Sequence, residues 1–146
     1  MARKKGERSK MANPVVHFEI VAKDPKKMQK FYSELFGWKI NADNPMGYGI
    51  IEKGSEQGIG GGIAGAQAGA PAGLMVYAEV DDVQKYLDKA VKLGSKVLMP
   101  VTVIPDMVTL AIFQDSGGTA FGLVKSGIHG AAAKKASAKT KAGKKK

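Results

Sequence analysis

The sequence of 146 residues predicts an α+β fold built from two similar βαβββ modules. The order of strand-like and helix-like segments in residues 13–66 recurs in residues 73–125. FGWKI, which begins at Phe36, corresponds to LGSKV, which begins at Leu93, so the repeat has a period of about 57 residues. Both predicted helices end at a glycine that precedes a similar strand. We therefore expect one domain, residues 13–125, with two modules that share a core.

The first module begins with VVHFEIV, residues 15–21. Alternation of apolar and polar side chains predicts a half-buried strand with His17 and Glu19 on the face away from the apolar residues. Asp24 and Pro25 are an N-cap and first-turn pair that begins a helix ending at Gly37. Apolar residues follow at helical spacing: Met28, Phe31, Tyr32, Leu35 and Phe36. Short apolar runs separated by turn residues predict three strands, at residues 38–40, 48–51 and 61–64.

The second module repeats this order. LMVYAEV, residues 74–80, places Leu74 and Val76 on one face and Met75, Tyr77 and Glu79 on the other. Asp81 or Asp82 caps a helix that ends at Gly94. Three further strands are predicted at residues 96–103, 107–114 and 120–125.

The net charge of +10 belongs to the two ends of the chain. Residues 1–10 carry five basic residues and one acid, and residues 126–146 carry seven lysines and no acid. Both ends lack the apolar content that a packed core needs, so residues 1–12 and 126–146 are predicted to be disordered tails. With no cysteine, thiolate chemistry and cysteine-based metal sites are excluded. No segment has the pattern of a signal peptide or membrane helix, so we expect a cytoplasmic protein.

Three segments together resemble one known family. They are VVHFEIVAKDPKKMQKFYSELFGWKI, VYAEVDDVQKYLDKAVKLGSKV and VIPDMVTLAIFQDSGGTAFGLV, and they cover most of residues 13–125. They resemble the vicinal oxygen chelate superfamily, in particular its glyoxalase and bleomycin-resistance-like branch. DSGGTAFGL is similar to that branch's closing strand, with Ser116 in place of the usual proline. The resemblance implies two modules that curl their sheets around a shared cleft, with the helices outside, and a possible homodimer.

The resemblance also implies where a metal would lie. In metal-using members, four side chains in the cleft hold one divalent ion, which activates the substrate as a Lewis acid. The first position falls on His17, which matches. The others fall on Met75, on Gly122 and within residues 60–64, where no side chain suits a hard divalent ion. We therefore expect no metal cofactor; in the alternative, one divalent metal is held by His17 with Glu19 or Glu79.

The faces turned away from the helices supply the candidate ligand-binding site. Aromatic, thioether and polar side chains suit a small organic molecule with an apolar or aromatic body. The predicted ligand-binding residues are His17, Glu19, Tyr48, Met75, Tyr77 and Met107. If Met75 and Tyr77 line an open cavity, Met75→Glu or Tyr77→Ala should abolish binding with little effect on stability. The glycines of residues 60–65 are expected to keep the cleft open; their G-x-G-x-x-G spacing lacks the helix that a dinucleotide site needs.

Three functions are compatible with these features. The first is a glyoxalase-like protein that binds a small organic ligand without a complete metal site, in the way that resistance proteins of the superfamily sequester theirs. The second is a metal-assisted lyase, isomerase or dioxygenase, with His17, Glu19 and Glu79 as candidate catalytic residues. In that case Glu19 and Glu79 would form a carboxylate pair able to remove a proton next to a carbonyl group. The third is a nucleic-acid-associated protein that binds through its basic tails.

The C-terminal tail carries its own testable prediction. Its lysines neutralise phosphates without contacting bases, so DNA binding should be indifferent to sequence and weaken with salt. The residues concerned are Lys134, Lys135, Lys139, Lys141, Lys144, Lys145 and Lys146. Fluorescence anisotropy at several salt concentrations should give a log–log slope of roughly −0.9 per phosphate contact. Unchanged binding after deletion of residues 126–146 would contradict a role for this tail.

Overall fold

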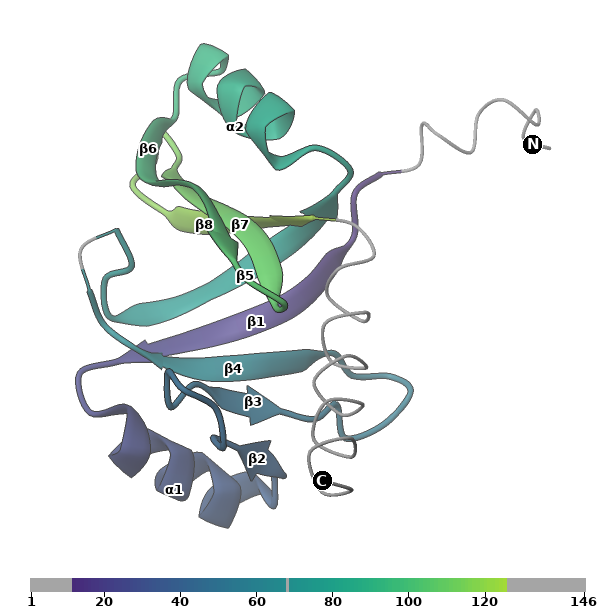
Figure 1. Ribbon diagram of the computed structural model, residues 1–146, viewed down its shortest axis with the longest axis vertical. Coiled ribbons are helices and arrows are strands. Elements are labelled where there is room, and N and C mark those ends of the chain that lie inside the picture. The colour runs from purple at the N-terminus through teal and green to yellow at the C-terminus, as the bar shows by residue number, and fades with distance from the viewer. Residues whose placement is uncertain (1–11, 68, 126–146) are drawn as a thin grey trace, which may run out of the picture.

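The computed structural model describes residues 12–67 and 69–125, and it confirms the α+β class (Figure 1). The two predicted tails lie almost wholly outside the described residues. The first module contains β1 (Val15–Ala22), α1 (Pro25–Phe36), β2 (Ile40–Asn41), β3 (Gly49–Ile51) and β4 (Gly60–Gly65). The second contains β5 (Gly73–Val80), α2 (Val83–Lys92), β6 (Lys96–Ile104), β7 (Val108–Gln114) and β8 (Ala120–Lys125).

All strands belong to one eight-stranded sheet in the order β2-β3-β4-β1-β5-β8-β7-β6. Counted outward from the centre, each module contributes its first, fourth, third and second strand. Strands β1 and β5 pair antiparallel in the middle, whereas β1 with β4 and β5 with β8 are parallel. Figure 1 shows the two modules on either side of this central pair. The shared strand order confirms the internal repeat and relates the modules by an approximate twofold axis.

Both helices begin where the sequence predicts. The Asp24 side chain accepts a hydrogen bond from the backbone N–H of Lys27 at 3.2 Å, and Asp82 accepts one from Lys85 at 3.1 Å. These N-caps satisfy donors that the first helical turn leaves free. Gly37 ends α1 with φ at 69°, a left-handed conformation that favours glycine. No helix among residues 12–67 and 69–125 is long and apolar enough to cross a membrane.

The central strands have two distinct faces. The helix face carries Phe18 and Ile20 of β1 and Leu74 and Val76 of β5, on the side of α1. The inner face is the opposite side, where His17 and Glu19 of β1 neighbour Met75 and Tyr77 of β5. The alternation predicted for both strands is therefore present.

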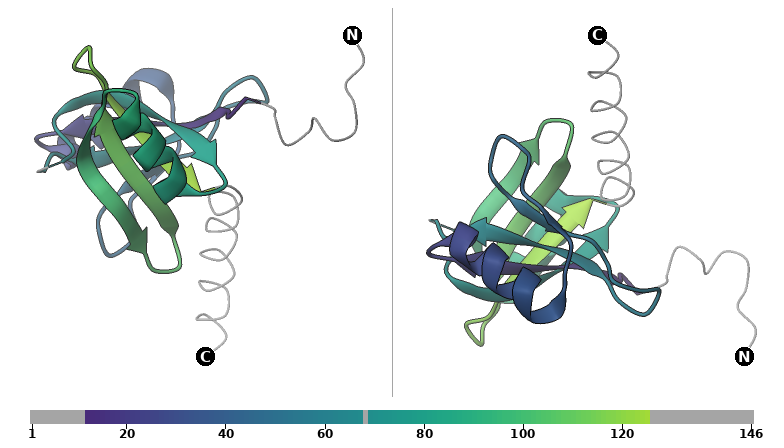
Figure 2. Two further views of the ribbon diagram at one scale, coloured as in Figure 1. Left: turned by 90° about the horizontal axis from the view of Figure 1, so that it is seen from above. Right: turned by 90° about the horizontal axis from the view of Figure 1, so that it is seen from below.

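The second module buries side chains on both faces of its sheet. Under α2 the buried cluster consists of Val80, Val83, Leu87, Ala111 and Leu123. On the inner face the buried cluster consists of Val21, Ala70, Met75, Tyr77, Ile112 and Val124. Seen from above and below (Figure 2), α1 and α2 lie on separate modules and do not contact each other closely. The inner face of the second module is thus part of the hydrophobic core.

Candidate functional site on the inner face

A buried carboxylate lies at the centre of the candidate site. Glu19 is 7% exposed and lies opposite Gly62 of β4 and Met75 of β5. The Tyr48 hydroxyl donates to Glu19 Oε1 at 2.9 Å, and the Tyr77 hydroxyl donates to Oε2 at 3.1 Å. Each carboxylate oxygen therefore has a tyrosine partner, which offsets part of the cost of removing a charge from water.

His17 extends this hydrogen-bond network. Its Nε2 lies 2.7 Å from the Tyr48 hydroxyl oxygen. Because Tyr48 uses its hydrogen toward Glu19, the oxygen accepts at this contact, so His17 Nε2 carries the proton. The His17 ring also meets the Tyr77 ring edge-on, with centroids 5.6 Å apart. Hydrogen bonds therefore run continuously from His17 through Tyr48 to Glu19, and Tyr77 bonds the other carboxylate oxygen of Glu19.

The electrostatics of the network favour bound protons. Burial raises the pKa of the Glu19 carboxyl, and the hydrogen bonds from Tyr48 and Tyr77 counter only part of that rise. Burial, followed by the adjacent Glu19 charge, raises the pKa of both tyrosines. Tyr48 and Tyr77 are consequently neutral hydrogen-bond donors at neutral pH.

The raised pKa of Glu19 predicts how stability depends on pH. The folded state holds this proton more tightly than the unfolded state, whose pKa is near 4.5. The stabilisation that this proton gives to the folded state is complete below about pH 4.5. It is lost as the pH rises through the pKa that Glu19 has in the folded state. Glutamine does not titrate, so Glu19→Gln should not lose this stabilisation as the pH rises. The free energy of unfolding of the variant, minus that of the wild type, should therefore increase with pH over this window. The increase should be about 1.4 kcal/mol per pKa unit, measured by denaturant unfolding. A difference that stays flat or falls with pH would contradict the assignment.

Glycines accommodate the two tyrosine rings. A Cβ atom at Gly62 would overlap the Tyr48 hydroxyl group, and one at Gly122 would overlap the Tyr77 ring. The expectation that the glycines of β4 hold the cleft open is therefore wrong for Gly62, because the space beside it is filled. By position in the two modules, Gly62 corresponds to Gly122, but the two rings come from different places: Tyr48 precedes β3, whereas Tyr77 lies on β5.

The residues present do not fit the divalent metal that the resemblance associates with this cleft. His17 is a suitable metal ligand, but the other positions where the resemblance implies a ligand hold Gly62, Gly122 and the buried Met75. The rings of Tyr48 and Tyr77 occupy the space in front of the two glycines. In the described part of the chain, no group of three His, Asp, Glu or Cys side chains is close enough to hold a metal ion. The donor set at this site consists of one imidazole and one carboxylate already bonded to two tyrosines.

The structure brings together five of the predicted site residues and separates Met107 and Glu79 from them. His17, Glu19, Tyr48 and Tyr77 form the network, and Met75 belongs to the buried cluster beside Tyr77. Met107 lies in the turn between β6 and β7, where its N–H donates to Ile104. Met75 lies opposite Glu19 on the neighbouring strand. Glu79 is four residues from Met75 along β5, so Glu79 lies about 13 Å from Glu19 in the strand direction. Glu19 and Glu79 do not form the carboxylate pair.

Asn44 is a positioning residue that sequence analysis missed. Its Oδ1 accepts from the Tyr48 N–H at 3.0 Å, and its Nδ2 donates to the Tyr48 carbonyl at 2.7 Å. This two-point contact fixes the loop that carries Tyr48 toward Glu19. The sequence feature that could have identified Asn44 is the segment NPMGY, residues 44–48. An asparagine before a proline is typical of a turn in which the asparagine side chain bonds the backbone.

Comparison with known proteins places this fold in a family. A family model described as the Glyoxalase/Bleomycin resistance protein/Dioxygenase superfamily matches residues 15–123. Proteins named "Putative glyoxylase CFP32" from Mycobacterium bovis and Mycobacterium tuberculosis are 34% identical over 113 residues, which cover 73% of this chain. The match spans 43% of the length of these relatives.

Solved structures share the fold at low sequence identity. A superfamily member from Vibrio splendidus has a TM-score of 0.50 at 15% identity, covering 78% of this chain and 98% of its own. A Streptomyces coelicolor methylmalonyl-CoA epimerase variant has a TM-score of 0.53 at 15% identity, covering 80% and 99%. These likenesses support the two-module architecture and say nothing of the ligand.

Proposed function

The chain belongs to the Glyoxalase/Bleomycin resistance protein/Dioxygenase superfamily, and we propose that it binds a small organic molecule at the inner face without a metal ion. The observation that carries this proposal is the buried Glu19 carboxylate, bonded to two tyrosine hydroxyls at the place where the two modules meet. A buried polar network of this kind is costly to build, and such networks are concentrated at functional sites.

The chemistry of the network defines the class of ligand. Glu19 retains acceptor capacity beyond its two tyrosine bonds, so it recognises a hydroxyl, amide or other donor on the ligand. His17 and Tyr48 are half-buried, in contrast to Glu19, so they are the members of this group that a ligand would meet before the carboxylate. The rings of Tyr48 and Tyr77 add flat apolar surface. We therefore propose a ligand with an apolar or aromatic body and a hydrogen-bond donor at one end.

The raised pKa of Glu19 supports a second candidate function, proton transfer. A carboxylate whose pKa lies above its ordinary value is a stronger base, and the hydroxyls that bond it hold it in one orientation. In this candidate Glu19 removes a proton from carbon next to a carbonyl group, and the bond electrons pass to the carbonyl oxygen as an enolate. Exchange of that carbon-bound hydrogen for solvent deuterium, seen by NMR and lost in Glu19→Gln, would support it.

A thermal-shift screen of the full chain tests binding. Aromatic metabolites, 2-oxoaldehydes and antibiotics are added with a chelator, and separately with divalent metal ions. A ligand at about 100 times its dissociation constant stabilises the folded state by about 2.7 kcal/mol, which raises the melting midpoint by several degrees. The shift should appear in the presence of chelator.

Matched tyrosine variants identify the site in the same screen. Tyr48→Phe removes the hydroxyl that joins His17 to Glu19, so the ligand-induced shift should shrink strongly. Tyr86→Phe is the control, because Tyr86 packs against the cluster under α2, away from the network. Equal shifts in both variants, or a shift that requires added metal, would overturn the proposal.

A further inference from the structure

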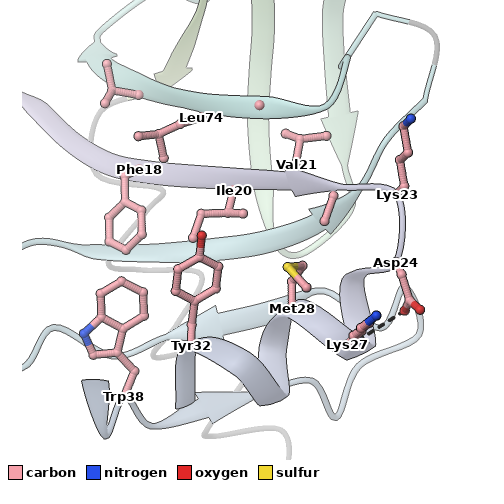
Figure 3. Close-up of a pocket in the computed structure, with 13 residues that line it drawn as sticks. Phe18, Ile20, Val21, Lys23, Asp24, Lys27, Met28, Tyr32, Trp38 and Leu74 are labelled. Carbon is pink, nitrogen blue, oxygen red and sulfur yellow. Dashed lines mark hydrogen bonds between the residues drawn. The ribbon is translucent and has the colours of Figure 1, made fainter. Parts of the chain in front are cut away.

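A hollow of about 770 Å³ lies between α1 and the helix face of β1 and β5 (Figure 3). Small-molecule sites in proteins have volumes of roughly 300–1,000 Å³ and mainly apolar walls. The apolar and aromatic side chains that line this hollow include Phe18, Met28, Tyr32, Trp38, Leu74 and Val76. Water finds few hydrogen-bond partners against such walls, so an apolar ligand would displace it at little cost. The hollow therefore has the size and lining of a ligand site, on the opposite side of the sheet from Glu19.

Helix α1 packs on its sheet less tightly than α2 does. No residue of α1 is buried, whereas α2 buries Val83 and Leu87. The two helices have corresponding places in the two modules, and Met28 and Tyr32 of α1 line the hollow. An amphipathic helix draws most of its stability from packing its apolar side. A molecule that fills the hollow would supply this missing contact, so we expect it to stabilise the fold.

The hollow has two chemically different ends. Phe18 and Trp38 form one end, where their ring centroids are 5.5 Å apart. Lys23, Asp24 and Lys27 form the other end (Figure 3). Phe18 lies on β1 and Lys23 directly follows that strand, so the two ends are separated by about 16 Å. The hollow is therefore elongated, with an aromatic end and a charged end.

The charged end carries a surplus of positive charge. Lys23 and Lys27 are exposed, and neither has an ion-pair partner within residues 12–67 and 69–125. Asp24 is the acidic residue at this end, and its carboxylate accepts the Lys27 N–H as the N-cap of α1. Two ammonium groups beside one carboxylate leave this end positive, so it complements an anionic group on a ligand.

We propose that the hollow binds a straight-chain carboxylic acid of medium length, as a second ligand site separate from the inner face. The hydrocarbon chain lies along β1, past Ile20 and toward Trp38. The carboxylate lies between Lys23 and Lys27. An elongated hollow with one charged end fits an acyl chain better than a compact ring, because a single ring would leave one end empty. The sheet separates this site from the Glu19 network, so the two sites act independently.

The fluorescence of Trp38 reports on this site directly, because Trp38 is the one tryptophan of the chain and lines the hollow. The full chain is titrated with decanoate below its micelle concentration. The emission maximum should move to shorter wavelength and saturate, because the acyl chain displaces water from the indole ring. Decanol and decyltrimethylammonium carry the same chain with a neutral and a cationic head group. Decanoate should bind roughly fivefold more tightly than decanol, the usual effect of exposed ion pairs, and the cation should bind most weakly.

Matched lysine variants test the position of the carboxylate. The double variant Lys23→Gln/Lys27→Gln should bind decanoate and decanol with equal affinity. Lys26→Gln is the control, because Lys26 is also exposed and lies in the same helical turn as Lys27 but does not line the hollow. This control should keep the roughly fivefold preference for decanoate.

Val76→Phe tests the position of the hydrocarbon chain. The larger side chain takes the space of about two methylene groups of the ligand, so the affinity for decanoate should fall by about tenfold. All variants should retain the wild-type circular dichroism spectrum, since Val76 borders the hollow and the lysines are exposed. Tyr48→Phe alters the inner-face network and should bind decanoate like the wild type, so failure here is distinct from failure of the inner-face site.

Several outcomes would overturn the proposal. The lack of a saturable change with decanoate shows that the hollow does not bind an acyl chain. Equal affinity of the wild type for decanoate and decanol, or loss of the preference in Lys26→Gln, shows that the carboxylate does not lie between Lys23 and Lys27. Loss of binding in Tyr48→Phe assigns the compound to the inner face. A Trp38 emission that depends on protein concentration alone shows that another copy of the chain fills the hollow.

Discussion

Tyr77→Ala should lower the free energy of unfolding by about 3–5 kcal/mol, the cost of deleting a buried aromatic side chain. Tyr77 is only 5% exposed and packs with Met75, Ile112 and Val124. The substitution leaves a cavity in this cluster and removes the donor to Glu19 Oε2. Denaturant unfolding at neutral pH measures the loss. The structure thus reverses the expectation that Tyr77→Ala would spare the unliganded protein.

Tyr77→Phe separates the two contributions. It keeps the ring and removes the hydroxyl, so the cost should fall to about 1–3 kcal/mol, the penalty for an unsatisfied buried acceptor. Tyr86→Phe is again the control and should have a smaller effect. If Tyr77→Ala costs no more than Tyr77→Phe, the ring is not part of the core, and the packing described for the inner face is wrong.

Gly122→Ala should also destabilise the protein, by about 1–3 kcal/mol or more, as is usual for overpacking a filled core. The added methyl group would overlap the Tyr77 ring, whose hydroxyl is fixed by its hydrogen bond to Glu19. The effect should be measured by denaturant unfolding beside Gly54→Ala, where an added Cβ meets no atom within 4 Å. Gly54→Ala should change stability by less than about 0.5 kcal/mol.

A double-mutant cycle shows whether the clash is the cause. In a Tyr77→Ala background the ring is absent, so Gly122→Ala should cost far less than it does in the wild type. The two substitutions would then have a combined effect smaller than the sum of their separate effects. Additive effects would mean that Gly122 is required for another reason, such as backbone conformation.

The parts of the fold that the sequence predicts well depend on neighbouring residues. Alternation in residues 15–21 and 74–80 predicts which side chains of β1 and β5 share a face, because side chains alternate along any strand. Asp24 and Asp82 identify both helix starts because capping requires contact only with the next turn. The repeat predicts that both modules have the same order of strands and helices along the chain. It does not predict the order of the strands in the sheet, which the structure supplies.

The site depends on contacts between distant residues, and there the sequence is less informative. Alternation places Glu19 and Tyr77 on one face but does not show that Tyr48, on a loop, reaches between His17 and Glu19. A glycine in a strand indicates space and does not show what fills it; here the rings of Tyr48 and Tyr77 do. Helical spacing likewise predicts the apolar stripe of α1 but not that its own sheet leaves half of Phe31 exposed.

The most direct test of the proposed ligand site is amide chemical-shift mapping by NMR, with a ligand from the thermal-shift screen and a chelator in the sample. The proposal predicts that the largest changes cluster around His17, Glu19, Tyr48, Gly62 and Gly122. Changes centred on Met28, Tyr32 and Leu74 would assign the ligand to the hollow beside α1 and contradict the inner-face site. Changes that appear only when a divalent metal replaces the chelator would contradict binding without a metal.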